Sequence, residues 1–366
     1  MWIIEHIIVE EHVILINTIS QIKAIDSTAM QRARFRQDDL IKPRGSLGRL
    51  EEISIQIAGI QGKVIPVINN KVIITMAGDH GIVASGVSAY PQEVTAQMVI
   101  NFLNGGAGIN VLSQHIDARI VVVDMGVSSD LDPHPDLLVR KVAYGTQDMT
   151  LGPAMTHEQA MQALQTGIDI ANTEIQNGAN IIGTGDMGIG NTTPSTAIAS
   201  VLSGKSPGEI AGRGTGLNDE GLKRKIHAIN KAIVANQPDA QDGLDILAKM
   251  GGFEIGGLTG VMLGAAAQRK AIMVDGFIST AAAMIAVKLA PQIKPYLIAS
   301  HRSAEKGHDI MLEWLGLHPL VELGMRLGEG TGAAIGISLA EAACKLLAGM
   351  ATFSEGGVTD KEDPVK

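Results

Sequence analysis

The sequence predicts an α/β protein with a large, mostly parallel sheet flanked by helices, plus a small helical domain. Short apolar runs recur from residue 72 onward, each followed by small, glycine-bearing or polar residues, which is typical of buried parallel strands. Helical patterns separate these runs, so crossover connections are expected. The chain also has 43 glycines in 366 residues, which indicates many backbone conformations that other residues avoid.

The elements can be placed along the chain by their local patterns. The expected strands lie in the runs VIITMAGDHG, RIVVVDMG, NIIGTGDMG, AIMVDGF and YLIASHR. Thr156 and Gln159 form a capping-box pattern before the helical segment MQALQTGIDIANTEI. Asn218 precedes two acidic residues, so we expect a helix from there to about Ile233.

Three regions follow from this order of elements. Residues 1–65 have helical patterns and no strand signal, and are predicted to form the N-terminal part of the small domain. Residues 66–332 are predicted to form the large α/β domain, with Rossmann-like layers. Residues 333–366 are expected to provide a C-terminal helix that joins the small domain, followed by a frayed polar tail.

Composition excludes several classes of protein. The net charge is −9, and no basic stripe interleaved with aromatic residues occurs, so a nucleic-acid partner is not expected. No uncharged apolar stretch reaches about 18 residues, the length of a membrane span. The N-terminus lacks the basic start of a signal peptide, so the cytoplasm is the expected compartment. Cys344, the lone cysteine, is predicted to be a buried small hydrophobe.

Three glycine loops are candidates for ligand binding, because ligands of parallel sheets lie beyond the carboxyl ends of the strands. The first, GTGDMGIGNTT, ends in Asn191 and Thr192, which are predicted to cap a helix with bare amides for an anion. The second, GRGTG, precedes another helix and could close over the same anion. In the third, Glu329 lies between Gly328 and Gly330 at the head of an apolar helix.

Glycine clusters alone are more typical of turns and close packing, but three such loops favour a ligand site. No Walker loop, dinucleotide fingerprint or GxSxG elbow is present, which disfavours a kinase, a dehydrogenase or a hydrolase. His301, Glu305 and His308 could share a helix face, yet without HExxH or paired cysteines a metal site is not expected. The basic run 223–225 is interpreted as a solvated helix face.

The loops together resemble one family, the nicotinate-nucleotide:dimethylbenzimidazole phosphoribosyltransferases. The resemblance spans about residues 40 to 350 and is carried by KPRGSLGRLEE, AGDHGIVASGVSAYPQEVT, GGAGINVLS, GTGDMGIGNTTPSTAI, GRGTGL, GGFEIGGLTG, DGFISTAAA, SHRSAEKGH and GMRLGEGTGAA. It implies a homodimer with active sites near the interface, small-molecule substrates, and no metal or organic cofactor. The family usually has Glu before MGIGNTT, so Asp186 is a departure.

The resemblance also implies roles for individual residues, with Glu329 as the catalytic base. The nucleotide and its phosphate would be bound by Asp186, Gly188, Ile189, Gly190, Asn191, Thr192, Gly212, Arg213, Gly214 and Thr215. The aromatic base would be bound by Asp79, His80, Gly81, Ser88 and Gln92. For Asp79 and His80, loop stabilisation is an equally good interpretation of the residues alone.

The implied reaction moves ribose phosphate from nicotinate mononucleotide to 5,6-dimethylbenzimidazole or a similar base, which gives α-ribazole 5′-phosphate and nicotinate in cobalamin assembly. Two alternatives stay open at this point. The acceptor could be a purine or a phenolic base on the same fold, since pocket shape decides the acceptor. The chain could also be a non-catalytic nucleotide-binding regulator, which would not need Glu329.

Overall fold

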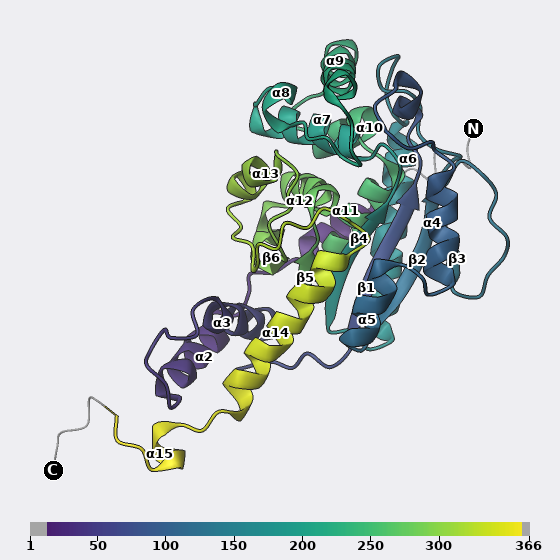
Figure 1. Ribbon diagram of the computed structural model, residues 1–366. Coiled ribbons are helices and arrows are strands. Elements are labelled where there is room, and N and C mark those ends of the chain that lie inside the picture. The colour runs from purple at the N-terminus through teal and green to yellow at the C-terminus, as the bar shows by residue number, and fades with distance from the viewer. Residues whose placement is uncertain (1–12, 361–366) are drawn as a thin grey trace.

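The computed structural model describes residues 13–360 of the chain, and its centre is one parallel sheet (Figure 1). The strands are β1 (Lys71–Gly78), β2 (Ala118–Gly126), β3 (Leu137–Val139), β4 (Ile181–Met187), β5 (Ala271–Val274) and β6 (Leu297–Ala299). Their order across the sheet is β3-β2-β1-β4-β5-β6, and every neighbouring pair is parallel. The α/β class and the five expected strands are therefore confirmed.

Strand β3 was not predicted from the sequence. It has three residues at the edge of the sheet and pairs only with β2. Three residues are too few for a periodic pattern, so pairing with β2 rather than local sequence defines this strand.

Helices cover both faces of the sheet. The helices with defined bounds, only some of which touch the sheet, are α2 (Ser27–Asp39), α3 (Arg49–Gln61), α4 (Val94–Leu103), α5 (Gly108–His115), α6 (His157–Gln176), α7 (Thr192–Ser203), α8 (Pro207–Ile210), α9 (Asp219–Asn236), α10 (Gly243–Met250), α11 (Phe253–Ala267), α12 (Phe277–Leu289), α13 (His308–Leu315), α14 (Thr331–Gly349) and α15 (Phe353–Gly356), with short 3-10 turns η1 (Gly81–Ser85) and η2 (Pro291–Tyr296). Helix α11 packs on one face and α4, α5 and α14 on the other.

The contact between α6 and α11 explains part of the high glycine content. A Cβ on Gly167 of α6 would lie 1.9 Å from Gly257 O of α11. A Cβ on Gly260 would lie 2.0 Å from Leu164 O. Only glycine allows the two backbones to approach this closely, so α11 is held tightly between the sheet and α6.

Helix α14 runs from the sheet to α2 and α3, which pack beside its far half (Figure 1). Among the described residues it is the one helix long and apolar enough to pass a membrane-span test, with half of the tested window buried. Its Glu341 pairs with Lys71 of β1 at 2.8 Å, and its buried face contacts α3, α5 and β4. The predicted domain boundaries stay a prediction, and residues 1–12 and the end of the tail, 361–366, lie outside the described part.

Three predicted helix starts are confirmed, but the side-chain cap expected at the third is wrong. Gln159 N donates to Thr156 Oγ1 at 3.2 Å and Thr156 N donates to Gln159 Oε1 at 3.0 Å, which completes the capping box. Asn218 Oδ1 accepts from the backbone of α9 at 2.9 Å. Asn191, in contrast, does not cap α7 through its side chain, because that amide donates to a carboxylate instead.

Candidate active site

The candidate site lies where the strand order reverses, at the carboxyl ends of β1 and β4. These strands are neighbours, and the next strands in sequence lie on opposite sides of them. Crevices at such a point are where open α/β sheets bind ligands. Residues 79–81 follow β1 and residues 188–191 follow β4, so two of the predicted segments meet here.

Glu329 lies at this crevice in a left-handed backbone conformation, with φ of 65°. Its N–H donates to Asp186 O at 3.1 Å, and its carbonyl accepts from Thr75 Oγ1 of β1 at 2.9 Å. A Cβ on Gly185 would lie 2.3 Å from Glu329 O. The backbone of Glu329 is therefore held by hydrogen bonds to both central strands, β1 and β4. These contacts compensate for the strain of its positive φ.

The carboxylate of Glu329 points to the start of α5. Its Oε2 accepts from Ile109 N at 3.1 Å, and the residue is 5% exposed. Burial raises the pKa of Glu329 above its ordinary value, although the amides of Ile109 and Gly108 act in the opposite direction. The result is a fixed, partly shielded carboxylate that binds a proton more readily than a free glutamate.

Asp275, at the end of β5, supports the Glu329 loop and was missed from the sequence. Its two carboxylate oxygens accept from Gly330 N at 3.2 Å and from Ala333 N at 2.9 Å, both at the start of α14. Its negative charge is a further cause of the raised pKa of Glu329. Asp275 thus holds the backbone that follows Glu329 and contributes to the raised pKa of Glu329.

Asp186 is a second buried carboxylate in the crevice. Asn191 Nδ2 donates to its Oδ2 at 2.8 Å. Burial, followed by the charge of Asp275, raises the pKa of Asp186 well above its ordinary value. Asp186 therefore takes up a proton at a higher pH than a surface aspartate does.

Asp186 lines a cavity of about 80 Å³. Glu329 and Asp275 are not among its lining residues, but each is next in the chain to one that is, Gly328 and Gly276. Asp186, Asn191, Thr192, Gly214, Thr215 and Gly328 come from the three predicted loops, and the cavity is completed by Gly276, Phe277, Ile278, His301, Ser303, Glu305, Arg326 and Leu327. Arg326 donates to Gly214 O at 3.0 Å. The second glycine loop is thereby connected to the segment that leads into the Glu329 loop.

The prediction that residues 223–225 form a solvated helix face is wrong for Lys225. Lys223 and Arg224 are exposed, but Lys225 is fully buried. Its Nζ donates to Thr192 Oγ1 at 2.7 Å and to Gly212 O at 3.4 Å. Burial lowers the pKa of Lys225 to about 8. A buried cation therefore joins the first two glycine loops.

A sequence signal for Lys225 did exist. It shares a face of α9 with the buried residues Gly221, Ala228, Ile229 and Ala232, at helical spacing. A charged residue on an apolar helix face requires a partner, since an unpaired buried charge is costly. This pattern distinguishes Lys225 from its two neighbours.

Arg213 does not line the cavity, unlike its loop neighbours Gly214 and Thr215. It is exposed, donates to Leu217 O at 2.9 Å and pairs with Asp219 at 2.5 Å. Gly212 lies against Glu305, because an added Cβ would meet Glu305 Oε2 at 1.9 Å. That oxygen is buried without a hydrogen-bond partner in the described residues, so it is available as an acceptor.

The segment after β1 packs closely against the first glycine loop. A Cβ on Gly188 would lie 2.3 Å from Gly78 O, and one on Gly190 would lie 2.6 Å from Val83. Ile189 N donates to Thr95 Oγ1 at 3.1 Å. The predicted base-binding and nucleotide-binding segments are therefore adjacent.

His80 and Asp79 are both held by buried contacts. His80 Nε2 is 2.8 Å from Glu254 Oε1, and both side chains are fully buried. Burial alone would lower the pKa of His80, but the charges of Glu254 and Asp79 outweigh it and raise that pKa. Asp79 Oδ2 accepts from Ser128 N at 2.8 Å. Both residues stabilise their loop, whatever other role they have.

The other predicted base-binding residues lie in the same segment. Gly81 N donates to Thr146 O at 3.1 Å, and Ser88 Oγ donates to Tyr90 O at 2.9 Å. Gln92 is half-buried just before α4. None of the three is among the residues that line the 80 Å³ cavity.

The histidine pair has structural contacts. His308 Nδ1 accepts from Ser303 N at 2.8 Å, and its Nε2 lies 2.9 Å from Thr280 Oγ1. Burial lowers the pKa of His308 to about 3, so its ring is neutral. Across residues 13–360, no group of three or more His, Cys, Asp or Glu side chains could hold a metal ion. Cys344 is buried as predicted, and burial raises the pKa of its thiol to about 12.

Comparison with known proteins agrees with this arrangement. A family model described as phosphoribosyltransferase matches residues 22–358. A Roseiflexus protein named nicotinate-nucleotide–dimethylbenzimidazole phosphoribosyltransferase is 56% identical, over 95% of this chain and 99% of that protein. A Desulforudis audaxviator protein of the same name is 53% identical, over 96% and 99%.

The fold also matches a solved structure. The crystal structure of the nicotinate-nucleotide–dimethylbenzimidazole phosphoribosyltransferase from Thermus thermophilus superposes with a TM-score of 0.87 at 43% identity. The match covers 92% of this chain and 100% of that one. The chain therefore belongs to the nicotinate-nucleotide–dimethylbenzimidazole phosphoribosyltransferase family.

Proposed function

We propose that this chain transfers the phosphoribosyl group of nicotinate mononucleotide to 5,6-dimethylbenzimidazole, giving α-ribazole 5′-phosphate and nicotinate for cobalamin assembly. The observation that carries the proposal is the buried Glu329 carboxylate, fixed at the switch point of the sheet beside two glycine loops. The proposed roles are general base for Glu329 and substrate binding for the surrounding loops.

The chemistry needs one base. Nicotinate leaves the sugar as a neutral ring, because its nitrogen is cationic while attached, so no acid is required for departure. One nitrogen of the benzimidazole forms the new bond to the anomeric carbon, and the other loses its proton to Glu329. Attack opposite the leaving group inverts the anomeric centre. General-base catalysis of this kind contributes a factor of about 10² to 10⁴, or about 3 to 5 kcal/mol.

The phosphate would be held by the loops around Lys225. Thr192 and Gly214 line the cavity, and Lys225 joins their two loops by donating to Thr192 Oγ1 and Gly212 O. The amides that begin α7 add the positive end of a helix dipole. The raised pKa of Asp186 supports this role, because a protonated Asp186 repels a phosphate less than a charged one. The residues proposed at the nucleotide are Asp186, Gly188, Ile189, Gly190, Asn191, Thr192, Gly212, Arg213, Gly214 and Thr215.

The aromatic acceptor would bind on the side of the segment after β1. That segment lies against the nucleotide loop at Gly188 and Gly190, so a base bound there would reach the sugar. The residues proposed to shape its site are Asp79, His80, Gly81, Ser88 and Gln92. We further propose that the enzyme is a cytoplasmic homodimer with a small helical domain formed from both chain ends.

The test is incubation with nicotinate mononucleotide and a panel of benzimidazoles, purines and phenols, with mass spectrometry of the riboside phosphate and nicotinate. We expect the dimethylbenzimidazole product at the highest rate. Faster transfer to a purine or a phenol would show that this compound, rather than dimethylbenzimidazole, is the acceptor. Nucleotide binding with no transfer to any acceptor would favour a regulator and contradict the proposal.

A further inference from the structure

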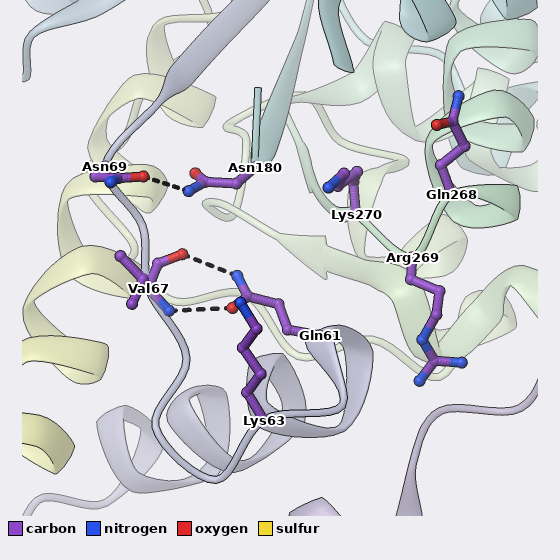
Figure 2. A pocket seen from close by; sticks show the side chains of 8 residues that line it. All are labelled: Gln61, Lys63, Val67, Asn69, Asn180, Gln268, Arg269 and Lys270. Carbon is purple, nitrogen blue, oxygen red and sulfur yellow. Dashed lines mark hydrogen bonds between the residues drawn. The ribbon is translucent and has the colours of Figure 1, made fainter. Parts of the chain in front are cut away.

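A second cavity lies at the amino ends of the strands, whereas Glu329 lies at their carboxyl ends. It has a volume of about 500 Å³, and Figure 2 shows the side chains that line it. The lining residues come from the end of α3 and the following segment (Gln61, Lys63, Val67, Asn69), from the residue before β4 (Asn180) and from the turn before β5 (Gln268, Arg269, Lys270). Because β1, β4 and β5 are neighbours, their amino ends bring these segments together.

The lining carries positive charge without acidic residues. Lys63, Arg269 and Lys270 all contribute to it, and no Asp or Glu does. The whole chain has a net charge of −9, so this concentration of cations is a local feature. A cavity lined by one sign of charge attracts ions of the opposite sign.

Two helices, α3 and α11, end beside the cavity, and cations often neutralise the negative ends of helix dipoles. Arg269 has that role: its guanidinium donates to Gly59 O at 2.8 Å, in the last turn of α3, and to Ala24 O at 3.1 Å. In Figure 2 this guanidinium points away from Lys270. The charge of Arg269 is therefore already used by the fold.

The two lysines differ from Arg269. Within the described part of the chain, the ammonium groups of Lys63 and Lys270 make no hydrogen bond or ion pair, and only the backbone amides of the two residues are bonded. Burial, and then the charge of Lys63, lowers the pKa of the half-buried Lys270. Like charges that line one cavity repel each other, and a bound anion would remove that repulsion.

The amide side chains leave donors toward the same space. Asn69 Oδ1 accepts from Asn180 Nδ2 at 2.5 Å (Figure 2), and Asn180 Oδ1 accepts from Asn70 N at 3.2 Å. Both amide oxygens are thus occupied, while Asn69 Nδ2 donates to no described group. The cavity offers two ammonium groups and an amide donor, which suits an oxyanion with several acceptor oxygens.

From this geometry we infer that the cavity is a second anion site, separate from the nucleotide site, which binds a phosphoryl group between Lys63 and Lys270. A tetrahedral dianion has several oxygens that accept hydrogen bonds, and Lys63, Lys270 and Asn69 all line the same cavity. The bound group would connect the segment after α3 to the start of β5, so it would also stabilise the fold by mass action.

The test is equilibrium dialysis with radiolabelled inorganic phosphate. We expect two classes of site in the wild-type protein. Lys225→Met should remove the class at the glycine loops, and the double variant Lys63→Met with Lys270→Met should weaken the other class by at least about tenfold. Lys231→Met, which removes an exposed lysine that lines neither cavity, is the matched control and should retain both classes.

Thermal unfolding without phosphate shows whether the double variant is folded, and Lys63→Met alone replaces it if it is not. Ribose 5-phosphate and succinate as competitors define the ligand. Displacement of the second class by the phosphate ester but not by succinate supports a phosphoryl site. A single class of site that Lys225→Met abolishes, or equal binding of succinate, would overturn the inference. Neither result depends on whether the chain transfers phosphoribose.

Discussion

The two glycine loops that face each other across the 80 Å³ cavity are held in different ways. Residues 328–330 are fixed at the N–H, the carbonyl and the carboxylate of Glu329, and Asp275 holds the next amide. Residues 212–216 are mostly exposed or half-buried, and among the described side chains only Lys225 and Arg326 donate to their carbonyls. The carboxylate that we propose as the base is therefore positioned before substrate binds, whereas the loop proposed to hold phosphate keeps donors free for it.

The largest effect should come from the fixed loop. Glu329→Gln keeps the size and an acceptor oxygen of the side chain but removes its basicity. We expect kcat to fall by a factor of about 10² to 10⁴ while nucleotide affinity is retained. Steady-state kinetics and calorimetric titration of nicotinate mononucleotide measure the two quantities. Near-normal turnover would exclude Glu329 as the base.

The second effect tests the opposite loop. Lys225→Met removes the buried cation while keeping a long apolar side chain, so the apolar face of α9 stays filled. We expect KM for nicotinate mononucleotide to rise about 10- to 100-fold. The unphosphorylated riboside, which should be a far poorer substrate of the wild type, should be used equally well by both proteins. An unchanged KM for the nucleotide would place the phosphate elsewhere.

A smaller effect tests how the fixed loop is supported. Asp275→Asn places an amide donor where a carboxylate now accepts from Gly330 and Ala333. We expect about a tenfold loss of kcat with little change in KM, and a loss of about 1 to 3 kcal/mol in the free energy of unfolding. Chemical denaturation measures the second quantity.

The pH dependence shows whether Asp275 also tunes the base. A general base acts in its deprotonated form, so if Glu329 has this role the rate should fall as the pH drops through its pKa, which is raised above the ordinary glutamate value. Asp275→Asn removes a negative charge that raises this pKa, so the acid limb of kcat/KM should move to lower pH. Repeating the pH profile with acceptor bases of different pKa distinguishes titration of the enzyme from titration of the acceptor, because only the latter moves the acid limb from one acceptor to the next. If the acid limb of Asp275→Asn lies at the same pH as that of the wild type, Asp275 has only a structural role.

Sequence patterns predicted the strands and the glycine loops because both are local. The run before Asp186 and the residues flanking Glu329 contain their own signals, and the structure joins the backbones of these two residues by a hydrogen bond. The supporting residues Asp275 and Glu254 have no such signal, since their partners lie 55 and 174 residues away and depend on the strand order. Lys225 was missed for another reason: its two charged neighbours hid its place on the buried face of α9.

The smallest effect concerns Arg213, which the family resemblance places at the phosphate. Its guanidinium instead pairs with Asp219 at the exposed start of α9, and exposed ion pairs contribute little. If the loop keeps this conformation in the complex, Arg213→Ala should change KM for the nucleotide by less than about fivefold. The rise in KM for Lys225→Met, measured in parallel, shows how large the effect of losing a phosphate contact is. An equally large rise in KM for Arg213→Ala would mean that residues 212–216 rearrange on binding and turn Arg213 toward the phosphate. That outcome would sharpen the contrast between the two loops, because one would then be fixed and the other would close over its ligand.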